Sequence, residues 1–262
     1  MKVEANGIQI NYELSGKENA PTVVLSHSLG SSMEMWNPQM ASLGSHYHLL
    51  RYDTRGHGGS EAPAGPYTLD QLGEDVIELL DLLNIETVHF VGLSMGGMIG
   101  QYLAINHANR LRSLALCDTA AIIAQEAQPV WQERIDTARE KGIQALAEAT
   151  LERWFTPRYL QQNPPEVQLI RKLFLSTPLE GFIGCSEAIR SLDNLRFLSQ
   201  IKTPTLIMVG ADDPGTPVDA SEEMHSRIHG SRLVVLSAAA HLSNVEQSSA
   251  FNQALLEFLN RY

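Results

Sequence analysis

Gly92-Leu93-Ser94-Met95-Gly96 places a serine between two segments of different character. His89-Phe90-Val91 is a short apolar run typical of a buried strand, and residues 97–105 form a mostly apolar run typical of a helix. A strand that bends sharply into a helix leaves no room for side chains two positions before and after the serine. Such a bend is a nucleophile elbow, and it holds the hydroxyl clear of the backbone at a helix N-terminus that favours negative charge. Ser94 is therefore a candidate nucleophile.

The segments around this elbow alternate between strand and helix patterns. Apolar residues recur at helical spacing over residues 68–83 and again over residues 248–259. Strand-like runs occur at residues 8–14, 22–26, 48–53, 88–92, 114–118, 205–209 and 233–236. Strand–helix alternation predicts a mostly parallel sheet flanked by helices. The length of 262 residues suits one domain, which we expect to span residues 1–262.

Residues 122–198 interrupt this alternation. No strand-like run occurs there, and Pro157, Pro164-Pro165 and Pro178 divide the segment into short helical stretches. Charges of the two signs nearly balance within it, so most of the net charge of −11 lies in the rest of the chain. The pattern predicts a helical layer inserted into the domain as a lid, which is compatible with a negatively charged substrate beneath it.

A nucleophilic serine needs a base and an orienting acid, and both follow late strands. The run 205–209 precedes a turn with Asp212 and Asp213, and the run 233–236 precedes a small-residue loop that ends in His241. The order Ser, Asp, His is the order of α/β hydrolases. Asp213 is the preferred acid because it precedes Pro214 and is held extended, while Asp212 remains the alternative. His241 would accept the Ser94 proton.

The negative charge that develops on a substrate carbonyl needs two hydrogen-bond donors. The Met95 N–H follows the nucleophile directly and is one candidate. The loop Ser26-His27-Ser28-Leu29-Gly30 follows the second core strand, and its Leu29 N–H is the other candidate. We expect His27 to brace this loop. Residues 53–60, with Asp53, Arg55, His57 and three glycines, indicate a tight turn rather than a catalytic group.

Composition excludes several classes of function. The net charge of −11 and the absence of a Lys/Arg-rich run argue against nucleic acid and anionic membrane partners. No apolar stretch is long enough for a membrane span, and the first residues lack the apolar core of a signal peptide. No histidine pair has metal-site spacing, so we expect no metal and no cofactor. Cys117 and Cys185 form no CxxC pair, and we expect reduced thiols in a cytoplasmic protein.

These motifs resemble the α/β-hydrolase superfamily over nearly the whole chain, and most closely the 3-oxoadipate enol-lactonases. The elbow and the Gly-His-Gly turn occur throughout the superfamily. The stretches Arg153–Thr156 and His241–Asn244 are narrower in distribution and favour the lactonases. The phrases that carry the resemblance are His27–Gly30, Arg51–Gly58, Gly65–Thr68, Gly92–Gly97, Arg153–Thr156 and Ala240–Glu246. The resemblance implies an eight-stranded, mostly parallel sheet with an inserted helical lid.

The resemblance also implies a reaction. The substrate would be 3-oxoadipate enol-lactone, a five-membered ring with an acetate side chain, in the β-ketoadipate pathway of aromatic catabolism. Arg153 or Arg190 would pair with the carboxylate and Trp154 would pack near the ring, unless both arginines are solvated and Trp154 belongs to the lid core. Alternatives are a broad carboxylesterase or lactonase on small esters, and a cofactor-free perhydrolase, since Met95-Gly96-Gly97 also occurs there. The sequence makes no prediction of oligomeric state.

Overall fold

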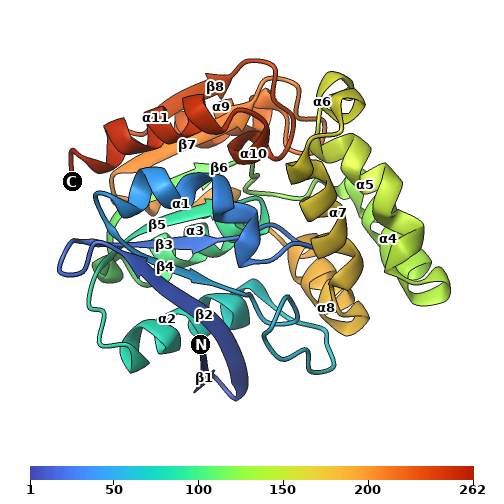
Figure 1. Cartoon of the computed structure of the whole chain (residues 1–262), viewed down its shortest axis with the longest axis horizontal. Coiled ribbons are helices and arrows are strands. Elements are labelled where there is room, and N and C mark those ends of the chain that lie inside the picture. Colours follow the sequence, from blue (N-terminus) through green and yellow to red (C-terminus); the bar gives the residue numbers. More distant parts are fainter.

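The structure is a computed structural model that describes residues 1–262, and its centre is one eight-stranded sheet (Figure 1). The strand order is β1-β2-β4-β3-β5-β6-β7-β8. Only β1 and β2 run antiparallel to their neighbours. The strands are β1 (Lys2–Ala5), β2 (Ile8–Gly16), β3 (Thr22–Ser26), β4 (His48–Tyr52), β5 (Val88–Leu93), β6 (Leu111–Cys117), β7 (Thr205–Gly210) and β8 (Arg232–Leu236).

The burial of each strand follows its place in the sheet. Every residue of the central strands β3, β5 and β7 is buried, as expected for continuous apolar runs covered by helices on both faces. Strand β2 alternates buried and half-buried residues along its first half, and the edge strand β8 is largely half-exposed. Alternation of apolar and polar residues in the sequence therefore predicted the half-buried strand β2, while apolar runs predicted the strands at the centre of the sheet.

Helices cover both faces of the sheet, as Figure 1 shows. Helices α1 and α11 pack together on one face, and α2, α3 and α9 cover the other. Their bounds are α1 (Asn37–Gly44), α2 (Leu69–Leu82), α3 (Met95–Asn106), α9 (Val218–Arg227), α10 (Ser243–Glu246) and α11 (Ser248–Leu259), with short 3-10 turns η1 (Met33–Trp36) and η2 (Ala108–Arg110). No helix combines the length and the apolar character that a membrane crossing requires.

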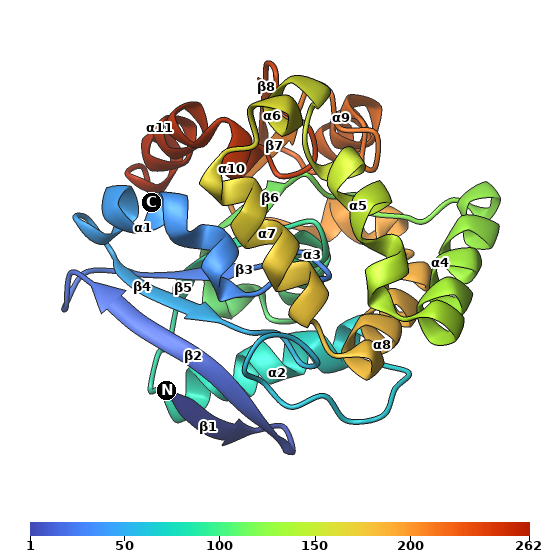
Figure 2. The same cartoon turned by 45° about the vertical axis from the view of Figure 1, so that its right-hand side comes forward.

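Between β6 and β7 the chain forms helices and an isolated bridge, Ile122 to Asp193. The helices are η3 (Gln125–Ala127), α4 (Gln128–Lys141), η4 (Ile143–Leu146), α5 (Ala147–Trp154), α6 (Pro157–Gln162), α7 (Pro165–Ser176), α8 (Leu179–Arg190) and η5 (Leu195–Gln200). Pro157 and Pro165 open α6 and α7, where a missing N–H costs no hydrogen bond. Figure 2 shows α4 to α8 gathered beside one end of the sheet.

That end of the sheet brings together the residues that follow its parallel strands. Ser94 follows β5, Asp118 follows β6, Asp213 lies in the turn after β7 and His241 in the loop after β8. Carboxyl ends of neighbouring parallel strands meet at one edge, so four polar side chains from distant parts of the sequence lie close together.

Candidate active site

Ser94 occupies a strained bend between β5 and α3. Its backbone has φ +56° and ψ −114°, a left-handed conformation that is uncommon for a residue with a side chain. A Cβ at Gly96 would lie 2.2 Å from the Ser26 carbonyl oxygen, and one at Gly92 would lie 2.1 Å from the Gly96 carbonyl oxygen. Only glycine fits at either position. The crossing of β3, β5 and α3 therefore fixes where the serine hydroxyl points.

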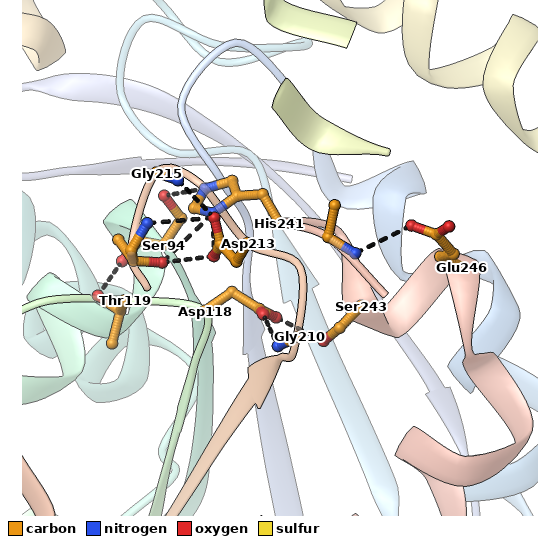
Figure 3. A network of polar contacts seen from close by, with 11 residues as sticks. Ser94, Asp118, Thr119, Gly210, Asp213, Gly215, His241, Ser243 and Glu246 are labelled. Atoms are coloured by element: carbon orange, nitrogen blue, oxygen red, sulfur yellow. Dashed lines mark hydrogen bonds and ion pairs between the residues drawn. The ribbon is translucent and has the colours of Figure 1, made fainter. Parts of the chain in front are cut away.

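The three residues expected to act together form a continuous hydrogen-bonded chain (Figure 3). His241 Nε2 lies 2.9 Å from Ser94 Oγ, and His241 Nδ1 lies 2.8 Å from Asp213 Oδ2. All three residues are buried, at 7% exposure or less. An imidazole between a hydroxyl and a carboxylate can take the hydroxyl proton and carry the resulting positive charge.

Asp213, rather than its neighbour Asp212, faces the histidine. Its Oδ1 accepts from the Gly215 N–H at 2.7 Å and its Oδ2 from the Thr216 hydroxyl at 2.6 Å. Burial raises the pKa of Asp213, but His241 and the Thr216 hydrogen bonds outweigh it, and the pKa is lowered. Asp212 is exposed. The acid beside His241 is therefore an ionised carboxylate.

The loop that carries Leu29 is held by two buried histidines. His57 Nε2 accepts from the Gly30 N–H at 2.9 Å, while His27 Nε2 accepts from the Thr54 N–H at 2.9 Å. Burial lowers the pKa of both imidazoles, and for His57 the nearby His27 lowers it further, to about 3. Neutral imidazoles can accept these hydrogen bonds. His57 thus braces this loop as well as its own turn.

The two backbone donors expected at the nucleophile are not used within the fold. No backbone or side-chain acceptor of the protein bonds the Leu29 N–H. The Met95 N–H is the first of α3, so no carbonyl of that helix can accept from it. Leu29 and Ser94 line the same cavity. Both N–H groups are therefore free of acceptors within the protein.

That cavity has a volume of about 570 Å³ and lies between Ser94 and the helices that follow β6. Most of its wall is apolar, with Ile122, Ile123 and Trp131 on one side. Trp154 is 7% exposed, lines the cavity and packs edge-on against Phe174 at 5.7 Å. Trp154 therefore belongs both to the cavity wall and to the packed interior of the helical layer.

Two arginines and His241 are the only charge-bearing side chains in the cavity wall. Arg153 is exposed at its edge, and Arg134 is half-buried, with its guanidinium 5.0 Å from the Trp131 ring centre. Burial and the nearby Arg153 lower the pKa of Arg134 to about 9, which leaves it charged at neutral pH. Neither arginine has a carboxylate within ion-pair distance.

Arg190 lies elsewhere, contrary to the expectation that it could meet a substrate carboxylate. Its guanidinium pairs with Glu187 at 3.1 Å and bonds the Gln132 side chain. It does not line the cavity. The reason is local: Glu187 lies one turn earlier on α8, and a carboxylate at that spacing meets the arginine on the helix surface.

The chain matches the family described as alpha/beta hydrolase fold over residues 21–248. The chain belongs to this family. It is 40% identical to 3-oxoadipate enol-lactonase 2 of Acinetobacter baylyi, over 98% of this chain and 96% of the relative. The putative carbamate hydrolase RutD of Yersinia enterocolitica is 29% identical, over 95% of this chain and 91% of the relative.

Solved structures agree with these relatives. The crystal structure of the enol-lactonase from Burkholderia xenovorans LB400 is 43% identical, with a TM-score of 0.96 that covers 99% of this chain and 100% of that chain. The expected α/β-hydrolase fold and the resemblance to enol-lactonases are therefore confirmed. The protein is an enzyme of the hydrolase class.

Reasoning from the sequence missed several residues that the structure brings to the site. Arg134 lines the cavity from α4. Because this helix is mostly polar, its sequence does not indicate which of its residues faces the cavity. Glu246 joins the helical layer to the histidine loop, because its carboxylate accepts from the Ala240 N–H at 3.1 Å and from the Thr156 N–H at 3.2 Å. Asp118 and Thr119 follow β6 directly beneath the triad residues (Figure 3).

Proposed function

We propose that the protein opens 3-oxoadipate enol-lactone by a serine hydrolase mechanism, in the β-ketoadipate pathway of aromatic catabolism. The observation that carries the proposal is the cavity over Ser94, in which Arg134 and Arg153 lack carboxylate partners. The enol-lactonase relatives, at 37–43% identity, support this choice of substrate. Residues 122–198 would serve as the lid that forms the cavity roof.

The first step forms an acyl-enzyme. His241 Nε2 takes the Ser94 proton as Ser94 Oγ bonds to the ring carbonyl carbon. The Leu29 and Met95 N–H groups stabilise the oxyanion. When the carbonyl re-forms, the ring C–O bond breaks and the enolate oxygen leaves with the proton from His241. Because an enolate is a good leaving group, positioning and oxyanion stabilisation are the main tasks of the protein.

The second step releases the product. A water molecule gives a proton to His241 and its oxygen bonds to the acyl carbon. The bond to Ser94 Oγ then breaks, and Ser94 regains the proton from His241. The products are the free carboxylate of 3-oxoadipate and the original serine, and the enol becomes the ketone in water. Asp213 holds the imidazole in the required orientation throughout.

The acetate group of the substrate needs a counter-charge, which Arg134 and Arg153 supply. Arg153 lies against the acid turn, since a Cβ at Gly215 would be 3.4 Å from its Nη2. Arg134 lies beside Trp131 on the lid. If the substrate carboxylate binds between these two guanidinium groups, the lactone ring points toward Ser94. Guanidinium groups that have no carboxylate within ion-pair distance can bind an anion through charge-assisted hydrogen bonds.

Hydrolysis of neutral esters is the second candidate. Its support is the cavity itself, whose 570 Å³ and apolar wall exceed the needs of a five-membered ring with one side chain. The same triad would act on such esters. The two candidates differ in whether the arginines contribute to catalytic efficiency.

Turnover of synthetic enol-lactone by the wild type and by Ser94→Ala tests the mechanism. We expect the alanine variant to lose at least about 10³-fold in kcat, because it lacks the nucleophile. Variants should be compared at equal folded concentration, determined by circular dichroism. Activity that survives the substitution would refute the acyl-enzyme mechanism.

Arg134→Ala and Arg153→Ala test the choice of substrate. One charge-assisted contact contributes about 1.5–3 kcal/mol, so each variant should raise KM for the lactone roughly 10- to 100-fold. KM for p-nitrophenyl acetate should change less than about twofold. Arg190→Ala is the matched control, since it removes a lid arginine outside the cavity. Equal effects on lactone and neutral ester would favour the second candidate.

A further inference from the structure

The end of strand β6 lies between the strands that carry the nucleophile and the acid. The sheet order β5-β6-β7 places Asp118 and Thr119 between the elbow and the Asp213 turn. Both side chains are fully buried. Asp118 has φ +44°, so the chain bends sharply here. Neither residue contacts Ser94 Oγ, His241 or Asp213 through a hydrogen bond, and neither has a role in the proposed reaction.

Thr119 bonds the nucleophile's own backbone. Its hydroxyl donates to the Ser94 carbonyl at 2.7 Å. The Met98 N–H donates to the same carbonyl at 3.1 Å, and the Ser94 N–H donates to the Cys117 carbonyl at 2.8 Å. Residues 117 and 119 thus hold both the amide and the carbonyl of a residue whose backbone is strained. These bonds oppose relaxation of the elbow.

Asp118 bonds the two other loops of the triad with one carboxylate. Its Oδ1 accepts from the Gly210 N–H at 2.8 Å, three residues before Asp213. Its Oδ2 accepts from the Ser243 hydroxyl at 2.5 Å, two residues after His241. Figure 3 shows this carboxylate below the triad, between both loops. The acid turn and the histidine loop therefore share one anchor.

We propose that Asp118 and Thr119 form a common anchor of the three triad loops and act as positioning residues for Ser94, Asp213 and His241. The proposal rests on the triad of the proposed function. A buried carboxylate is costly, and an apolar side chain would fill the same space more favourably. Burial and the nearby Asp213 raise the pKa of Asp118 well above its usual range, although Ser243 and Gly210 bond it. The two hydrogen bonds of Asp118 offset part of this free-energy cost and fix the separation of the acid turn and the histidine loop.

The Thr119 pair of variants tests the nucleophile side. Thr119→Val keeps the shape of the side chain and removes the donor to Ser94, whereas Thr119→Ser keeps the donor. Since small misplacements at a catalytic group can cost up to about 100-fold in rate, we expect Thr119→Val to lower kcat about 10-fold or more at nearly constant KM. Thr119→Ser should restore most of kcat.

Thr205→Val is the matched control. The Thr205 hydroxyl also donates to a backbone carbonyl, that of Thr203 at 2.8 Å, and is equally buried, but it lies at the opposite end of β7. Its melting temperature should fall by about as much as that of Thr119→Val, with kcat unchanged. An equal loss of kcat in both variants, or none in Thr119→Val, would overturn the proposal.

Asp118→Asn and Ser243→Ala test the other loops. Asn keeps the acceptor for Gly210, so we expect a smaller loss of kcat than in Asp118→Ala, for which we expect about 100-fold. If Asp118→Ala does not fold, Ser243→Ala replaces it, with an expected loss of roughly 3- to 10-fold. A wild-type kcat in folded Ser243→Ala and Asp118→Asn would contradict the shared anchor.

Two readouts separate this inference from the proposed function. Hydrolysis of p-nitrophenyl acetate and the rate of Ser94 inactivation by a fluorophosphonate depend on the triad but not on the natural substrate. Both rates should fall together in Thr119→Val. Hydrolysis that persists in Ser94→Ala would instead remove the triad mechanism itself, whatever the anchor variants show.

Discussion

His89 makes stability depend on pH in a way that one substitution can isolate. It lies on β5, 1% exposed, with Nδ1 at 2.8 Å from the Ser113 hydroxyl and its ring edge-on to Tyr47. Burial, with a smaller effect of Arg112, lowers its pKa from 6.5 to about 4. As pH falls, the unfolded chain binds the proton first. Stability present above pH 6.5 is therefore lost as pH falls toward 4.

The size of the effect follows from the two pKa values. As pH falls from about 8 to about 5, His89 in the folded state, with a pKa of about 4, stays almost unprotonated, while in the unfolded state it changes from almost unprotonated to almost fully protonated. At 1.36 kcal/mol per pH unit, this difference removes about 2 kcal/mol from the free energy of unfolding. His89→Gln keeps a hydrogen-bonding partner for Ser113 and cannot titrate. Its pH-dependent loss should be smaller by about 2 kcal/mol.

Urea unfolding at both pH values measures this difference directly. His229→Gln, which removes an imidazole from the exposed turn between α9 and β8, is the control and should keep the pH dependence of the wild type. Because His89 lies away from the cavity, ester hydrolysis should be unchanged in the variant. A variant whose stability falls with pH as steeply as that of the wild type would refute the reasoning.

Three further substitutions have defined outcomes. Gly96→Ala forces a Cβ to within 2.2 Å of the Ser26 carbonyl, so kcat should fall at least about 100-fold; an active, stable variant would contradict the packing of the elbow. Asp213→Asn should lower kcat by about 10³- to 10⁴-fold with little change in KM, as steady-state kinetics would show, because it disfavours the required histidine tautomer. Glu246→Gln weakens the junction of Thr156 with Ala240, so the melting temperature should fall by about 3–6 °C in a thermal melt, and a smaller shift would count against this junction.

Much of the sheet could be predicted because burial leaves a direct trace in the sequence. Val23–Leu25 is an unbroken apolar run since helices cover both faces of the strand, and Thr22–Ser26 forms β3 with the expected bounds. The edge is harder to predict. Strand β1, Lys2–Ala5, is short and has only one buried residue, and it was missed although Asn6-Gly7 is a strong hairpin signal. Both turn residues have positive φ.

The residues of the site also fall into some that the sequence could predict and some that it could not. Ser94, Asp213 and His241 could be placed in sequence because each follows a recognisable strand, and the parallel sheet brings strand ends together. Arg134 and Arg190 could not be distinguished. Both lie on helices of residues 122–198, and only the packing of α4 against α8 decides which arginine faces the cavity. The order of the strands along the chain predicts which residues reach the site from the sheet. Which residues reach it from the helices of residues 122–198 depends on how each helix is rotated about its own axis.

The junction between the lid and the histidine loop has a consequence for how a substrate reaches the serine. Besides the Glu246 contacts, the Leu242 N–H donates to the Trp154 carbonyl at 3.0 Å, so the Trp154 side of the cavity is fastened to the loop that carries His241. Exposed residues of the cavity wall include Ile122 and Val130, which follow β6, and Pro214 and Pro217 in the acid turn. A substrate that comes from solvent would pass these exposed residues. Arg153 is exposed in the same wall, so an anionic ester would meet a positive charge before it reaches Ser94.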